Sequence, residues 1–303
     1  MRVKGVSPDG KKAVEFESEE TRFIFNAQRK IDQIVPLVRN DAHKIIEECM
    51  IQANVAAARY IEKNEAAALF RVHDRPGEER LTGFRDFLAE LGLELKGGLE
   101  PEPKDFAELA AKFEGRPDAE LLSTMLLRSM RQAVYQADNI GHFGLALKSY
   151  AHFTSPIRRY PDVLVHRVLQ QCLDKAPQID KKMEAKCKHC SERERSAMES
   201  ERAANKYKQV EYMSQFLGEE FDGVVSGVAS FGFWVETLAH KCEGLVSIVG
   251  LSEFDDFRHI ESDYSLVGKR SGRSFKMGDK VFIKVIAANL DKRQLDYEWV
   301  QVP

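Results

Sequence analysis

The chain has no long apolar run. No stretch approaches the roughly twenty apolar residues that are needed to cross a bilayer, and the N-terminal MRVKGVSPDGKK lacks the apolar stretch of a signal peptide. We therefore expect a protein without membrane contact that works in the cytoplasm.

Cysteine is scarce and odd in number. Five cysteines scattered over 303 residues are not a disulfide framework. Cys187, His189 and Cys190 could be half of a zinc site, but structural zinc needs four ligands and no second cysteine pair stands at the usual spacing. Coincidental helix residues are the favoured interpretation.

A basic balance is also absent, since the formal net charge is -3. No overall field attracts nucleic acid, so RNA binding would need locally concentrated positive charge. The hydrophobic share of 43% supports a packed interior, and the charged share of 31% supports a well-solvated surface. A chain of this length exceeds what one small core usually needs, which indicates two or more folding units.

The most informative segment is Tyr150 to Arg167, YAHFTSPIRRYPDVLVHR. Pro156 biases the residue before it away from helical dihedrals, and Pro161 suits the first turn of a helix. Arg158 and Arg159 are therefore predicted just before a helix N-terminus, where guanidinium groups and free N–H groups can bind phosphate. The alternative is that both arginines pair with carboxylates of this acidic chain.

Together with GHFGLAL at Gly141 to Leu147, this segment resembles the signature of the catalytic domain of the ribonuclease II and ribonuclease R family. The resemblance continues through RNDAHKIIEECMIQAN, LFRVHDRP, RPDAELLSTMLLRSM and the helix from Glu194 to Met213. Such an ordered series is more specific than one short pattern. It implies a monomeric, magnesium-dependent 3′ to 5′ exoribonuclease that hydrolyses single-stranded RNA to nucleoside 5′-monophosphates.

The resemblance also assigns residues. Arg158 falls at the family's catalytic arginine, and Glu201 falls where the family places an acidic residue close to the scissile end of the RNA, although the helix allows a slip to Glu194. The same motif implies RNA contacts for His152, Ser155, Arg159 and Tyr160.

One long amphipathic helix is predicted from Asp41 to Glu62, because its apolar residues recur at helical spacing. Glu47 and Asn54 share one face of it. The resemblance suggests that they line the nucleic-acid channel or brace the metal site. The alternative, held equal, is a polar pair that satisfies neighbouring backbone groups.

A cluster of closely spaced aspartates, which binds magnesium in relatives ahead of the motif at Arg39, is missing from this sequence. Asp255 and Asp256 are adjacent, but neighbours on a strand point to opposite faces. We therefore expect the Mg²⁺ ligands outside this chain, in a missing N-terminal half that would be its partner. The isolated chain is expected to bind RNA weakly and to be inactive or nearly so.

From Gly218 onward, short β-rich runs with glycine bends predict a small antiparallel barrel. The predicted fold is α+β. By the resemblance, residues 1–216 are expected to form the mainly helical C-terminal part of the family's catalytic domain, called the RNB domain, and residues 217–303 resemble an S1 RNA-binding domain of OB-fold type. A noncatalytic RNA-binding module built on this barrel is the alternative function.

Within the barrel, Phe231 and Phe233 stand two apart on a predicted strand and so share one face, where the resemblance implies that they stack on bases. The alternative is that one or both fill the core. Ser247 stands where many relatives place histidine. A basic stretch, whose only nearby acid is Asp279, could hold phosphates or be a solvated hairpin. It contains Lys269, Arg270, Arg273, Lys276, Lys280 and Lys284.

Overall fold

The computed structural model describes residues 21–37, 40–116, 118–178, 180–260 and 264–301. These residues form two compact units. The first takes its described residues from 40–114 and 123–197, and the second from 21–37, 115–122 and 198–301. No helix within the described ranges is long and apolar enough to cross a bilayer.

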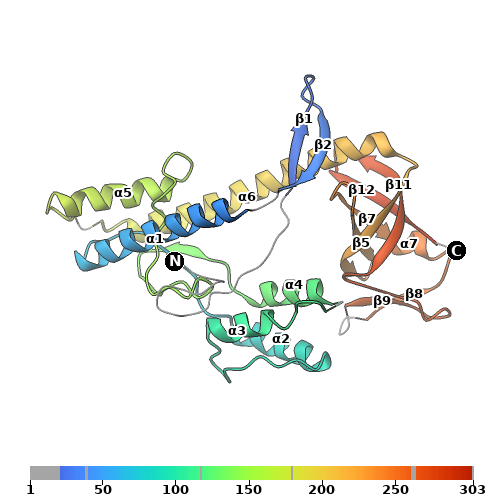
Figure 1. The fold of residues 1–303 in the computed structure, drawn as a ribbon, viewed down its shortest axis with the longest axis horizontal. Coiled ribbons are helices and arrows are strands. Elements are labelled where there is room, and N and C mark those ends of the chain that lie inside the picture. The colour runs from blue at the N-terminus through green and yellow to red at the C-terminus, as the bar shows by residue number, and fades with distance from the viewer. Residues whose placement is uncertain (1–20, 38–39, 117, 179, 261–263, 302–303) are drawn as a thin grey trace. The chain divides into compact units, whose positions relative to one another are not determined.

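The first unit is mainly helical (Figure 1). Its strands β3 and β4 form a two-stranded antiparallel sheet that pairs Phe70 with Gln136. The elements are α1 (Asp41–Lys63), β3 (Phe70–Val72), α2 (Glu78–Glu90), α3 (Pro103–Ala110), β4 (Val134–Gln136), α5 (Tyr160–Leu173) and the parts of α4 (Ala119–Ser129) and α6 (Met183–Met213) that fall within its ranges.

The predicted helix from Asp41 to Glu62 is confirmed as α1. Asn40 begins it with a capping box, in which its side chain accepts from the amide of His43 and the His43 ring accepts from the amide of Asn40. The predicted apolar face is wrong for the first turns, because Ile45 and Ile46 are exposed. Buried positions start only at Ile51, where the helix meets the core.

Three of the five cysteines lie in the core of the first unit, where they pack with Ala58, Ile61, Leu69, Val165 and other apolar side chains. Burial raises the pKa of the Cys187 thiol to about 12, so the thiol stays protonated near neutral pH. His189 lies on the exposed side of α6, whereas Cys187 and Cys190 are buried. The three side chains of the C-x-H-C pattern therefore do not converge.

The second unit is rich in β-strands. A hairpin of β1 (Thr21–Phe25) and β2 (Ile31–Pro36) accompanies a closed five-stranded barrel and a three-stranded sheet. The remaining elements are η1 (Ser214–Phe216), β5 (Glu220–Ala229), β6 (Gly232–Thr237), β7 (Glu243–Ser247), α7 (Ile248–Leu251), β8 (Phe257–Ile260), β9 (Ser265–Gly268), β10 (Ser274–Lys276), β11 (Lys280–Asn289) and β12 (Gln294–Val300).

The barrel runs in the order β11-β12-β7-β6-β5. The prediction of a purely antiparallel barrel is wrong at one seam, because β12 pairs with β7 in parallel through Asp296 and Tyr297. A parallel neighbour needs a long connection. The chain supplies it by leaving β7 through α7 and the three-stranded sheet before returning as the β11–β12 hairpin. Phe233, Phe275, Ile283, Tyr297 and Trp299 are among the side chains that fill the core.

Candidate nucleic-acid interface

The turn before α5 carries the two adjacent arginines. The backbone amides of Arg158 and Arg159 donate to the carbonyl of Ser155 at 3.3 and 3.0 Å. Helix α5 then begins at Tyr160, with Pro161 in its first turn, so the predicted helix start is confirmed. The side chain of Arg158 is exposed, and no ion pair of this residue is found in the described part of the chain.

Arg159 is engaged within the protein. Its guanidinium donates to the Oδ1 atom of Asp162 at 2.8 Å, and the Asp162 carboxylate is fully buried. The same Oδ1 atom accepts from the amide of Ser155 at 2.8 Å. The interpretation that an arginine pairs with a carboxylate is therefore correct for Arg159, which leaves Arg158 as the arginine of the turn that faces solvent.

Asn54 holds the other side of the same turn. Its Oδ1 atom accepts from the amides of Phe153 and Thr154 at 2.9 and 3.2 Å, and its Nδ2 atom donates to the hydroxyl of Tyr150 at 3.0 Å. With only 3% of its surface exposed, Asn54 cannot line a channel. It satisfies neighbouring backbone groups, whereas Glu47, two turns earlier on α1, is exposed.

His152 lies among aromatic rings. Its Nδ1 atom is 2.8 Å from the hydroxyl of Tyr135, and the rings of Tyr135 and Tyr150 meet it edge-on. Burial, together with the positive charges of Arg159 and Arg71, holds the pKa of His152 far below its usual range. The imidazole is therefore neutral at physiological pH and adds no positive charge to a phosphate site.

An ion pair that sequence reasoning missed lies beside these rings. The guanidinium of Arg71 donates to the carboxylate of Glu194 at 2.6 Å and sits 4.7 Å from the ring centroid of Tyr135. Glu194 is the alternative position for the acidic residue of α6. Its carboxylate is engaged with Arg71, whereas Glu201, about two turns further along the helix, is exposed. Arg71 lies opposite Tyr135 in the pairing of β3 with β4, a contact that no local pattern in the sequence indicates.

The two phenylalanines of the barrel do not share a face, so that prediction is wrong. Phe233 has no exposed surface and stacks on Phe275 with ring centroids 4.5 Å apart, whereas Phe231 is 51% exposed. Strand alternation does not apply, because β6 begins only at Gly232. Gly232 has a φ of 149°, and a Cβ there would lie 2.2 Å from the carbonyl oxygen of Val246. Phe233 cannot stack on a base, whereas Phe231 meets Trp234 edge-on at 5.3 Å.

The basic stretch has more acidic neighbours than the sequence indicated. Lys269 pairs with Asp256 at 2.5 Å, and Arg270 pairs with Asp255 at 3.2 Å. The prediction that Asp279 is the only nearby acid is therefore wrong, because residues 13 to 15 positions earlier reach the stretch. The carboxylate of Asp279 accepts from the backbone amide of Lys276.

Asp255 should make the stability of the second unit sensitive to acid. Its buried carboxylate accepts from the hydroxyl and amide of Ser271 and from Arg270, and these hydrogen bonds hold the pKa of Asp255 well below its usual range. The stabilisation is complete above the unfolded pKa of about 4 and is lost as the pH falls through the lower folded-state pKa.

We expect the melting temperature of the barrel to fall as the pH is lowered below about 4, and Asp255→Asn to lessen that dependence. Thermal melts followed by circular dichroism between about pH 7 and pH 2 measure it. Asp256→Asn is the control, because its side chain is 67% exposed. Equal pH dependence in the parent and in Asp255→Asn would contradict the prediction.

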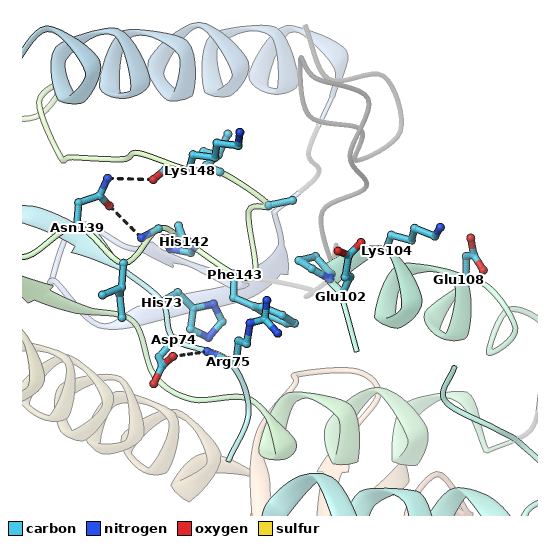
Figure 2. A pocket seen from close by; sticks show the side chains of 15 residues that line it. His73, Asp74, Arg75, Glu102, Lys104, Glu108, Asn139, His142, Phe143 and Lys148 are labelled. Atoms are coloured by element: carbon cyan, nitrogen blue, oxygen red, sulfur yellow. Dashed lines mark hydrogen bonds between the residues drawn. The ribbon is translucent and has the colours of Figure 1, made fainter. Parts of the chain in front are cut away.

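A cavity of about 580 Å³ lies in the first unit, between the stretch after β3 and residues 139–148 (Figure 2). Its wall includes His73, whose Nε2 atom lies 2.6 Å from the carbonyl of Arg131 and whose Nδ1 atom accepts from the amide of Gly144. Burial lowers the pKa of His73. Lys104, Lys148 and Arg75 line the cavity together with Asp74, Glu102 and Glu108, so its charges balance.

No group of three or more histidine, cysteine, aspartate or glutamate side chains that could hold a metal ion occurs among the described residues. Near the arginine-bearing turn, the carboxylate of Asp162 is buried, and its Oδ1 atom already accepts two hydrogen bonds. The residues that the structure describes therefore do not form a magnesium site.

The family model of the RNB domain matches residues 8–175, which is more than half of the chain. The chain therefore belongs to the RNB domain family, that of ribonucleases II and R. Within it, the chain is 52% identical to ribonuclease R of Vibrio cholerae, over 97% of this chain and 37% of that protein. It thus spans little more than a third of the length of that relative.

Solved structures agree with this assignment. The chain superposes on Mycoplasma genitalium RNase R in complex with ribose-methylated single-stranded RNA with a TM-score of 0.86 and 25% identity, covering 95% of this chain and 46% of that one. It also superposes on yeast Ssd1, a pseudonuclease, with a TM-score of 0.60, 20% identity and coverage of 76% and 30%. This second likeness concerns the fold alone.

Proposed function

We propose that this chain is part of a 3′ to 5′ exoribonuclease that hydrolyses single-stranded RNA to nucleoside 5′-monophosphates in the cytoplasm. The observation that carries the proposal is the exposed guanidinium of Arg158 on a turn that Asn54 and Asp162 hold in place. Similarity to ribonuclease R over 97% of the chain supports it.

In this proposal, Arg158 donates to the nonbridging oxygens of the terminal phosphate. Its planar fork matches two phosphate oxygens, and its charge stabilises the negative charge that develops as the phosphodiester is attacked. Tyr160, which follows on the exposed start of α5, contacts the RNA beside it. Arg159 and Ser155 shape the turn through Asp162, and His152 contributes a neutral hydrogen-bonding ring. Glu47 contacts the RNA, and Glu201 is the acidic residue that acts at its scissile end.

Magnesium is the expected cofactor, but the described residues do not fit it. We propose that its ligands lie in another part of the enzyme, outside this chain. The domain boundary at 216/217 belongs to the same proposal, with an RNB catalytic part in residues 1–216 and an S1 domain in residues 217–303.

Two observations support the S1 interpretation of the barrel. A five-stranded Greek-key barrel is the architecture of the OB-fold, in which the face of the second and third strands binds oligonucleotides. Those strands correspond to β6 and β7, and the exposed ring of Phe231 stands at the start of β6. Phe231 therefore offers a stacking surface for a base. Lys269, Arg270 and Lys276 supply positive charge, although Asp256 and Asp255 pair with Lys269 and Arg270.

The chain alone should not digest a 3′-tailed single-stranded RNA in the presence of Mg²⁺, whereas a chimera should. In the chimera, residues 1–303 replace the matching 37% of Vibrio cholerae ribonuclease R. Release of mononucleotides, resolved on a sequencing gel, measures the activity. Digestion by the chain alone would contradict our placing of the metal ligands, and a folded chimera that digests nothing would count against the nuclease.

A noncatalytic RNA-binding module is the second candidate. The exposed Phe231 favours it, because stacking on a base needs no metal ion. The same chimera separates the two candidates: RNA binding without release of mononucleotides would support the module.

A further inference from the structure

Asp162 has no part in the proposed chemistry, yet its charged side chain is fully buried next to the turn that carries Arg158. It is a carboxylate with no exposed surface, three residues into the first turn of α5. A buried charge is costly unless it is paired and hydrogen-bonded. The positive end of the helix dipole and the guanidinium of Arg159 both favour a negative charge at this position.

A single atom of Asp162 ties together the two ends of the turn that carries Arg158. Its Oδ1 atom accepts from the amide of Ser155 at the start of the turn and from the side chain of Arg159 at its end, both at 2.8 Å. The carbonyl of Ser155 accepts in turn from the amides of Arg158 and Arg159. The backbone of Arg158 is thus enclosed in a hydrogen-bonded ring that depends on Asp162.

The surroundings of Asp162 are not those expected if the residue served only to stabilise the fold. Its Oδ2 atom, the Nε atom of Arg159 and the hydroxyl of Thr154 are all buried and have no hydrogen-bond partner among the described residues. Buried polar atoms without partners are rare in folded proteins and call for an explanation. Orientation of the neighbouring Arg158 is such an explanation.

We infer that Asp162 is a positioning residue: through Ser155 and Arg159 it fixes the turn so that Arg158, the exposed arginine, points at the phosphate. The expected effect on catalysis rests on the proposed function, whereas the fixing of the turn rests on the hydrogen bonds of Asp162 alone. Asn54 holds the segment just before the turn independently, through Phe153 and Thr154.

In the chimera, Asp162→Asn should lower kcat roughly tenfold, less than the hundredfold that a displacement of about 1 Å can cost, and leave KM within about threefold. A double-mutant cycle with Arg158→Ala is decisive. If Asp162 acts through Arg158, then the double variant is no slower than Arg158→Ala alone. Additive losses, or parental kcat in Asp162→Asn, would overturn the inference. Asp174→Asn, on an exposed residue at the end of the same helix, is the matched control.

A second measurement needs no activity and uses the 303-residue chain itself. Hydrogen–deuterium exchange of a peptide covering 153–160 should be faster in Asp162→Asn than in the parent or in Asp174→Asn, because the Ser155 amide loses a charged acceptor. Unchanged exchange in this peptide would overturn the inference, even if the chimera proved inactive. If Asp162→Asn does not fold, Arg159→Lys tests the same ring, and parental exchange and kcat there would overturn it equally.

Discussion

Replacing Arg158 with alanine should lower the turnover of the chimera about a hundredfold or more, with a smaller effect on RNA affinity. The expectation follows from the exposed guanidinium at the start of α5 and from the cost of removing one preorganised donor to a developing negative charge. Single-turnover digestion of 3′-tailed RNA, together with binding measured without Mg²⁺, separates the two quantities.

Two further variants sharpen the Arg158 experiment. Arg158→Lys should retain part of the turnover, because an ammonium keeps the charge but loses the planar fork. Arg128→Ala removes another exposed arginine, in the last turn of α4, and should leave turnover unchanged. Normal turnover with weakened binding in Arg158→Ala would reduce Arg158 to a residue that only holds the RNA.

Phe233→Ala should destabilise the barrel by about 3 to 5 kcal/mol, because it empties a fully buried site against Phe275. Both tryptophans of the chain, Trp234 and Trp299, lie in the barrel strands, so denaturant unfolding followed by tryptophan fluorescence reports on this unit. The variant should shift the unfolding midpoint to a much lower denaturant concentration.

Phe231→Ala should weaken RNA binding and leave the stability of the barrel unchanged. We expect unfolding close to that of the parent and an affinity for single-stranded RNA weakened by about 1 to 3 kcal/mol, the value of one stacked base. Phe25→Ala is the matched control, because Phe25 is also 51% exposed and lies in the same unit. Weakened binding in both variants, or a large loss of stability in Phe231→Ala, would contradict the assignment of the two rings.

Local sequence predicted the elements that depend on neighbours in the chain. The helix from Asp41, the start of α5 at Pro161 and the β-rich region after Gly218 all follow from apolar spacing, proline positions and glycine bends. The parallel pairing of β7 with β12 was missed, because it joins residues 51 positions apart in the chain, such as Leu245 and Asp296.

The candidate site divides in the same way. The pair Arg158 and Arg159 was found from its motif, but their different roles were not, because only the fold brings the buried carboxylate of Asp162 to Arg159. Nor could the sequence show that Arg71 pairs with Glu194 across 123 positions, or that Asp255 and Asp256 reach Arg270 and Lys269.

By itself, then, the sequence determined the family, the order of helical and β-rich parts, and the turn on which chemistry is expected, because motifs and residue periodicity are properties of neighbouring residues. Tertiary structure alone decided which of the candidate site residues have exposed side chains. Asn54 binds the backbone before the turn, Phe233 lies in the core, and Arg158 is the arginine that faces solvent. Burial and pairing are set by contacts between residues far apart in the chain.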